Sequence, residues 1–273
     1  MEVVLVAVLI FLVFASVSKK PAESAEATRD ERPAMINDSE SEGLFLWDGD
    51  TITALTAKGT EARSVVIPEK CRHINENVFS NSFVGRVEFL GNEDIDINGV
   101  FRESNVYGVT LPQGLSVIGA QAFCGDTSIS HIDIPQRTET IGKGAFQDCT
   151  SLNSVTFSGS LREIRENAFR NTAFERIELP DGLEVIGNHA FSGCGELREV
   201  IFPDSVKSIG LDAFGKTKIE NVTFPGGVEL SAFDVRAFGE RTGKISVYIR
   251  EGSWMDTHRE YWGAENFKEV VLY

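Results

Sequence analysis

Three residues of the types found in hydrolytic triads are predicted to lie close together. His131 and Asp133 are two residues apart on one predicted strand, so both face outward from it. Ser154 holds the equivalent place on the next predicted strand, within a few ångströms of both. A triad also needs a strained nucleophile turn and an oxyanion hole, and neither signature accompanies Ser154. We therefore expect a polar surface here and predict that the protein is not an enzyme.

The four cysteines are the other residues with chemical potential. Cys149 and Cys194 share one repeat position, two repeats apart, which is about 10 Å at the usual strand spacing and too far for a disulfide. Cys71 stands where other repeats carry leucine, and Cys124 directly follows a phenylalanine. Their spacing fits no metal site. We expect free thiols that act as small apolar groups, with a Cys124–Cys149 bridge as the alternative.

A repeating unit of 22 to 25 residues positions all of these side chains. The last apolar residue of each predicted strand recurs at Ile67, Phe89, Leu111, Ile134, Phe157, Leu179, Phe202, Phe224, Ile249 and Leu272. A second series keeps the same step at Phe79, Phe101, Phe123, Phe146, Phe169, Phe191, Phe214 and Phe238. Two series in register predict a solenoid, in which each coil stacks only on its neighbours.

Each part of the unit has a physical role. Alternating residues of a short strand point inward and outward, and a proline follows six of the strands and ends their pairing. Glycine after isoleucine, as in Ile186-Gly187, permits a bend, and the Ala-Phe pair places a ring in the core from a short helical turn. We predict a β-rich repeat solenoid with a parallel β-sheet of about ten short strands on one face and short helical turns on the other.

The unit resembles the BspA-like leucine-rich repeat family. The resemblance rests on the proline after the strand, the Ile-Gly and Ala-Phe pairs, and the Cys, Leu and Val positions of the unit. It extends over about residues 44–273. It is strongest over 109–135, 132–157, 177–203 and 200–225. It implies a secreted or surface protein that binds host or extracellular-matrix proteins in adhesion. It carries over no catalytic residue and no cofactor.

The repeat divides the chain into five segments. We predict a signal peptide over residues 1–18, a disordered acidic and Ser-rich linker over 19–43, an N-terminal cap over 44–64, the leucine-rich repeat array over 65–249 and a C-terminal cap over 250–273. The first cap is expected to be a hairpin around Asp48-Gly49-Asp50. The last is expected to be a short helix in which Trp254, Tyr261 and Trp262 cover the final coil.

The predicted signal rests on an apolar run from Val3 to Val17 that only Ser16 interrupts. Its length suits a signal core better than a membrane span of about 20 residues. Glu2 and Lys19-Lys20 favour the alternative, an uncleaved membrane anchor (residues 3–18) with the remainder in the cytosol. We therefore predict that the protein is secreted or on the cell surface. The alternative, if the segment is retained, is a membrane-anchored or intracellular scaffold. Asn37 begins a glycosylation sequon in the linker.

Net charge argues against two classes of partner. The chain carries a formal charge of −15, and no basic cluster is longer than Lys19-Lys20. Because neutralising phosphates drives nucleic-acid affinity, we expect no nucleic-acid binding. The same charge disfavours docking on anionic lipid, so membrane contact is expected only through the N-terminal segment.

The outward strand positions are the predicted binding site for a protein partner. Ten strands at the usual spacing give a face about 45 Å long, and its residues are not dictated by the repeat. The alternative is a solvated face without a ligand. Asn221 begins a second sequon on this face, where a glycan would obstruct binding. The predicted partner-binding residues are Arg86, Glu88, His131, Asp133, Arg176, Glu178, Glu199, Ile201 and Tyr248.

Overall fold

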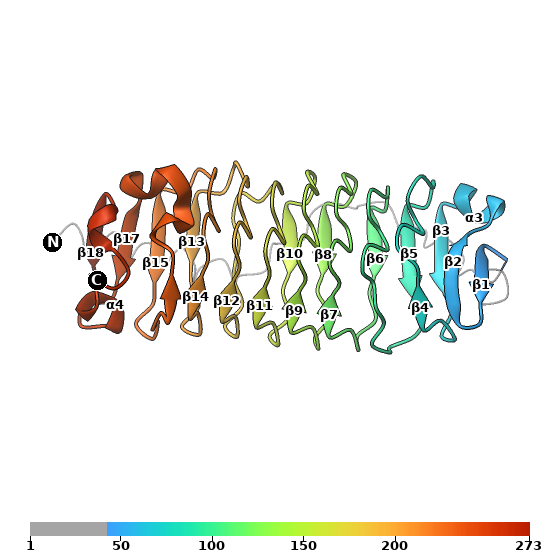
Figure 1. The fold of residues 1–273 in the computed structure, drawn as a ribbon, viewed down its shortest axis with the longest axis horizontal. Coiled ribbons are helices and arrows are strands. Elements are labelled where there is room, and N and C mark those ends of the chain that lie inside the picture. Colours follow the sequence, from blue (N-terminus) through green and yellow to red (C-terminus); the bar gives the residue numbers. More distant parts are fainter. Residues whose placement is uncertain (1–42) are drawn as a thin grey trace, which may run out of the picture.

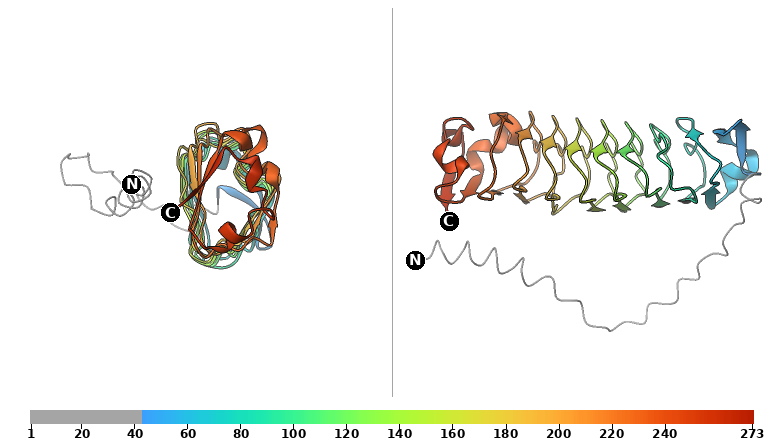
Figure 2. Two further views of the ribbon diagram at one scale, coloured as in Figure 1. Left: turned by 90° about the vertical axis from the view of Figure 1, so that its left-hand side faces the viewer. Right: turned by 90° about the horizontal axis from the view of Figure 1, so that it is seen from below.

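The computed structural model describes residues 43–273, which form an elongated solenoid (Figure 1). Viewed along its axis, the coils superpose as a single ring of chain around one core (Figure 2). The predicted solenoid is thus confirmed. The signal or anchor segment, Asn37 and the linker up to residue 42 lie outside the described residues.

One side of the coil carries the strands expected from the sequence, here called the front sheet. Their pairing is parallel throughout and falls into three ladders. Nine of the ten expected strands are present, and the segment around Ile177–Leu179 forms none. The front strands are β3 (Ser64–Ile67), β5 (Arg86–Phe89) and β6 (Gly108–Thr110); β8 (His131–Asp133) and β10 (Ser154–Thr156); and β13 (Glu199–Ile201), β15 (Asn221–Phe224), β17 (Ser246–Ile249) and β18 (Glu269–Leu272).

A second parallel sheet, here called the back sheet, was not expected. It is continuous over six coils, and its register places isoleucine beside isoleucine from Ile118 to Ile209. A turn begins directly after each of the following glycines, where we predicted a bend, and these glycines also allow close packing between coils. A Cβ on Gly142 would lie 2.7 Å from the carbonyl oxygen of Ile118, and Gly142 does not have a positive φ. The strands are β7 (Val117–Ile118), β9 (Thr140–Ile141), β11 (Glu163–Ile164), β12 (Val185–Ile186), β14 (Ser208–Ile209) and β16 (Ala232–Phe233).

The Ala-Phe segments form tight turns that are hydrogen-bonded to the next coil and are not helices. The Phe123 N–H donates to the Ala145 carbonyl at 2.7 Å, and the Phe146 N–H donates to that of Ala168 at 2.8 Å. Extra inter-coil hydrogen bonds therefore replace the helical turns we predicted. Phe238 is the exception, because it lies in a 3₁₀ segment, η1 (Val235–Lys244), that is broken at Gly239.

The eight phenylalanines of these turns form one continuous stack along the solenoid axis. All eight are at most 1% exposed. Neighbouring ring centroids are 4.7 to 5.6 Å apart, and their planes differ by 5 to 20°. Because the repeat returns each ring to one place in the coil, the stack is the centre of the core.

Both predicted caps are present. At the N-terminal end, β1 (Phe45–Asp48) and β2 (Thr51–Leu55) form an antiparallel hairpin, β4 (His73–Ile74) pairs with β2, and α3 (Ala57–Glu61) follows. At the C-terminal end lie α4 (Trp254–Thr257) and η2 (Ala264–Asn266). Trp262 is 1% exposed and its indole N–H donates to the Met255 carbonyl at 2.7 Å. Tyr261 is 57% exposed, so Trp262 closes the core and Tyr261 does not.

Candidate functional site

The predicted binding residues all belong to the front side of the coils, and those on paired strands keep the expected register. Arg86 and Glu88 pair with Gly108 and Thr110, and Asn221 lies between Glu199 and Ser246. The second sequon is therefore on this face. Tyr248 of β17 is half-buried between Thr223 and Val271, which makes it a poorer anchor than the sequence indicated. The predicted residues do not converge on one point but are spread along the solenoid.

His131, Asp133 and Ser154 meet as predicted. His131 Nδ1 lies 3.0 Å from Ser154 Oγ, and His131 Nε2 lies 3.0 Å from Asp133 Oδ1. Hydrogen bonds from Thr156, and then from His131, hold the pKa of the Asp133 carboxyl below its ordinary value.

This trio is exposed on an open strand surface. The side chains of His131 and Asp133 are 48% and 76% exposed. The backbone N–H of Ser154 donates to Ser130 O at 3.3 Å, so it is not directed at a developing oxyanion. The arrangement is a hydrogen-bonded polar surface on the front sheet.

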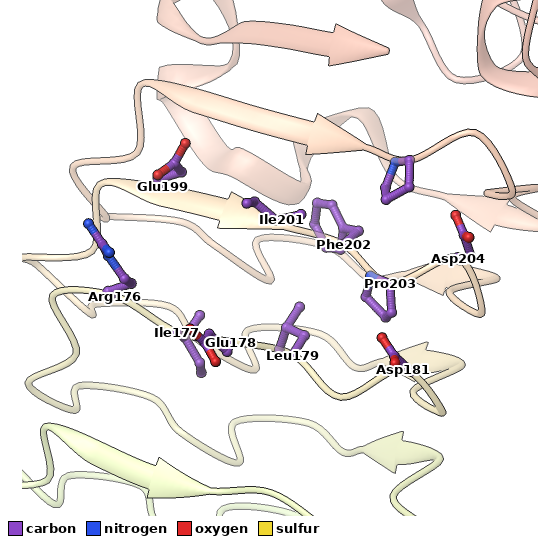
Figure 3. A pocket seen from close by; sticks show the side chains of 11 residues that line it. Arg176, Ile177, Glu178, Leu179, Asp181, Glu199, Ile201, Phe202, Pro203 and Asp204 are labelled. Carbon is purple, nitrogen blue, oxygen red and sulfur yellow. The ribbon is translucent and has the colours of Figure 1, made fainter. Parts of the chain in front are cut away.

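Four of the predicted residues, Arg176, Glu178, Glu199 and Ile201, come together around a hollow in the front face (Figure 3). This hollow, here called the front groove, has a volume of about 300 Å³. Seven further residues complete its lining: Ile177, Leu179, Asp181, Phe202, Pro203, Asp204 and Pro225. Arg176 and Glu199 lie at one end, and Asp181 and Asp204 lie at the other (Figure 3).

The front groove lies where the front sheet is interrupted. β10 pairs only with β8, and β13 pairs only with β15, so neither ladder includes the coil between them. Within the described chain, no backbone hydrogen bond joins Ile177–Leu179 to a neighbouring coil. The sequence could not show this, because Ile177-Glu178-Leu179 has the same alternation as the paired strands. Asp204 was not predicted either, although the dipeptide Pro180-Asp181 recurs as Pro203-Asp204 one coil later.

A family model decides the classification of the chain. The model for the BspA type leucine rich repeat region matches residues 51–136 and 116–243. The chain belongs to this family. No curated protein matches this BspA-type repeat protein.

Several crystal structures resemble this BspA-type protein. The pneumococcal vaccine antigen PcpA shares 13% identity over 77% of this chain and 68% of that chain, with a TM-score of 0.52. The Treponema (T. pallidum) leucine rich repeat protein TpLRR shares 24% over 81% and 74%, with a TM-score of 0.39. A leucine rich cell surface protein from Faecalibacterium prausnitzii shares 16% over 81% and 82%, with a TM-score of 0.39. The likeness to the pneumococcal antigen shows a common fold.

Two features bear on membranes and metals. Between residues 43 and 273, no helix has the length and hydropathy needed to cross a bilayer. Within that same range, no three His, Cys, Asp or Glu side chains are grouped as metal ligands.

The cysteines of this BspA-type protein are free thiols, and the alternative Cys124–Cys149 bridge is absent. Cys71, Cys149 and Cys194 are buried, and Cys124 is half-buried. Cys149 Sγ lies 3.0 Å from the Phe123 carbonyl, to which it donates. Burial raises the pKa of Cys71 and of Cys194 to about 11, and it raises those of Cys124 and Cys149 as well.

We expect a thiol-specific chromogenic reagent to modify only Cys124 in the folded protein near neutral pH, and to do so slowly. The thiolate is the reactive form, and Cys124 is the one cysteine of the four with partial exposure. All four should react in denaturant without reductant. A Cys124→Ser variant should show no native-state reaction. Fewer than four reactive thiols in denaturant would instead indicate a disulfide.

Proposed function

We propose that the protein is a non-enzymatic binding module, secreted or displayed on the cell surface, that mediates adhesion by holding a protein partner on its front face. The observation that carries the proposal is the composition of this face. The fold dictates which positions point outward but not what fills them. Here they are filled mostly by charged and polar residues, together with Ile201 and Tyr248. Such a face, with the front groove in it, fits a large partner better than a small substrate.

Two observations outside the front groove support the proposed function. The family resemblance favours host or extracellular-matrix proteins as partners. The apolar run Val3–Val17 has the length of a signal core, which favours export. Export is compatible with the free thiols, because none of the four has to pair for this solenoid to form. The alternative, an anchored or intracellular scaffold, is favoured by Glu2 and Lys19-Lys20 and would use the same front face.

The test is binding of the mature protein to purified extracellular-matrix proteins, measured by biolayer interferometry. Sequencing of its N-terminus comes first, and a start near residue 16 or 19 is expected for an exported protein. Charge reversal at each of Arg86, Asp133 and Glu178 should then weaken binding to at least one matrix protein. Because like charges brought together at an interface repel strongly, we expect about tenfold for the residues in contact.

Arg137→Glu is the matched control. Arg137 is exposed on the loop after β8, outside the outward columns of the front sheet, so its reversal should leave affinity unchanged. Binding that is insensitive to all three front-face reversals would contradict the proposed site. An absence of binding to every matrix protein would contradict the adhesive role.

A further inference from the structure

The front groove has an apolar floor between charged ends. Leu179 and Phe202 are at most 9% exposed, and Pro203 is also buried, while Ile201 is half-buried and faces outward. In Figure 3 these side chains lie between Arg176 and Glu199 at one end and Asp181 and Asp204 at the other. An occupant is therefore expected to bring apolar groups to the floor and polar groups to the charged residues around it.

The charge around this floor is mostly negative. Four carboxylates line the groove, at Glu178, Asp181, Glu199 and Asp204, against the single guanidinium of Arg176. Among the described residues, Glu178, Asp181 and Glu199 have no ion-pair partner. By contrast, Glu184 and Glu196 of the same two coils are each paired with lysine. The groove thus leaves negative charge uncompensated beside an apolar surface.

The shape of the groove favours an extended chain. Its lining runs along the strand direction, from Arg176 to Asp181 on one coil and from Glu199 to Asp204 on the next. In an extended peptide, successive side chains point to opposite sides and alternate ones share a side. In a segment that alternates basic and apolar residues, the apolar side chains can therefore face the floor. The long basic side chains leave from the opposite side and can reach back to the carboxylates at the rim.

We propose that the front groove binds an extended polypeptide segment of the partner in which arginine or lysine alternates with apolar residues. The inference rests on the proposed function, because it names the chemistry of the partner that the front face holds. The apolar side chains pack on Leu179, Ile201 and Phe202. The basic side chains pair with Glu178, Glu199 and the Asp181–Asp204 end.

The test uses the full chain and a fluorescein-labelled short peptide of alternating arginine and leucine, followed by fluorescence anisotropy. Matched peptides alternate glutamate with leucine and arginine with serine. We expect the arginine–leucine peptide to bind most tightly, the arginine–serine peptide more weakly and the glutamate–leucine peptide not at all. Raising the salt concentration should weaken binding, because the rim charges are screened. Equal binding of all three peptides would overturn the proposal.

Two variants locate the binding in the groove. The double variant Glu178→Gln/Asp181→Asn removes two rim charges and should weaken arginine–leucine binding about fivefold. Ile201→Thr should weaken it about threefold by removing apolar contact. Threonine occupies the same column at Thr110, Thr156 and Thr223, so the fold tolerates it. The control Glu76→Gln/Glu139→Gln removes two exposed carboxylates that lie outside the front strands, and it should leave affinity unchanged.

The outcomes separate this inference from the proposed function. Matrix binding that is lost on reversal of Arg86 or Asp133, with no peptide binding, would overturn the groove inference and leave the front-face function intact. Peptide binding without any matrix binding would support the groove chemistry and contradict the adhesive role. If the peptide does not bind and the groove variants instead abolish self-association of the chain, the occupant is a second copy and the proposal is wrong.

Discussion

Phe146→Ala is expected to lower the free energy of unfolding by about 3–5 kcal/mol, the usual range for a buried phenylalanine. Phe146 is fully buried at the middle of the phenylalanine stack. Its ring lies 5.1 to 5.2 Å from those of Phe123 and Phe169, nearly parallel to both. Alanine would remove the apolar surface, leave a cavity and break both stacking contacts. Urea unfolding followed by circular dichroism measures the loss.

The solenoid adds a second expectation for this variant. Each coil contacts only its neighbours, so a weakened central interface also reduces the coupling between the two halves. We therefore expect a broader unfolding transition with a lower apparent m value. Phe83→Ala is the matched control, because Phe83 is 77% exposed and should change stability by no more than about 0.5 kcal/mol. A loss below about 1 kcal/mol for Phe146→Ala would contradict the importance of the stack.

Asp126→Ala is expected to lower the free energy of unfolding by at least about 3 kcal/mol, because it leaves several buried hydrogen-bond donors without an acceptor. Asp126 is fully buried three residues after Phe123. Its Oδ1 accepts from the N–H groups of Ser128 and Ile129 at 2.8 and 3.1 Å, and its Oδ2 accepts from that of Val106 at 3.1 Å. The Ser104 hydroxyl donates to the same Oδ2. One carboxyl therefore joins two coils, and the loss is measurable by urea unfolding.

Asp126→Asn is the control and also tests the pH dependence. Burial raises the pKa of Asp126 above its ordinary value of 3.8, so the native state binds this proton more tightly than the unfolded chain does. The contribution of this carboxyl to stability is therefore greatest below 3.8 and falls as pH rises through the native pKa. Asparagine retains an acceptor but does not titrate. We expect the stability advantage of the natural protein over Asp126→Asn to grow as pH falls from neutral, and a constant difference would contradict it.

The repeat could be predicted because its two residue series recur with the same spacing. Stacking of the coils restricts the inward positions to a few apolar residue types. The back sheet was missed because each of its strands is only two residues long, as in Val117–Ile118, which is too short for alternation to appear. The packing role of the Ile-Gly glycines was also missed. Gly142 has no Cβ that would collide with the preceding coil. A distance between two coils cannot be predicted from the residues next to the glycine.

The candidate site could be predicted as a set of outward positions but not as a groove. The alternation of inward and outward side chains along each strand placed Glu178 and Ile201 on the front face. Which of these residues share a hollow depends on the lost pairing at Ile177–Leu179, a property of how three coils fit together. The contact between His131 and Ser154 needed only the spacing of the repeat, and it was predicted correctly.

The unequal continuity of the two sheets has a mechanical consequence. The back sheet is an unbroken ladder from β7 to β16, whereas the front sheet is divided before β8 and again between β10 and β13. A rod with one continuous side and one segmented side is elastically anisotropic, because bending that opens the segmented side stretches fewer hydrogen bonds. The compliant points of this rod coincide with the breaks, and one of them is the front groove. A ligand bound in the groove would link the coils on either side of this break. The bending stiffness of the solenoid would then be higher when the groove is occupied.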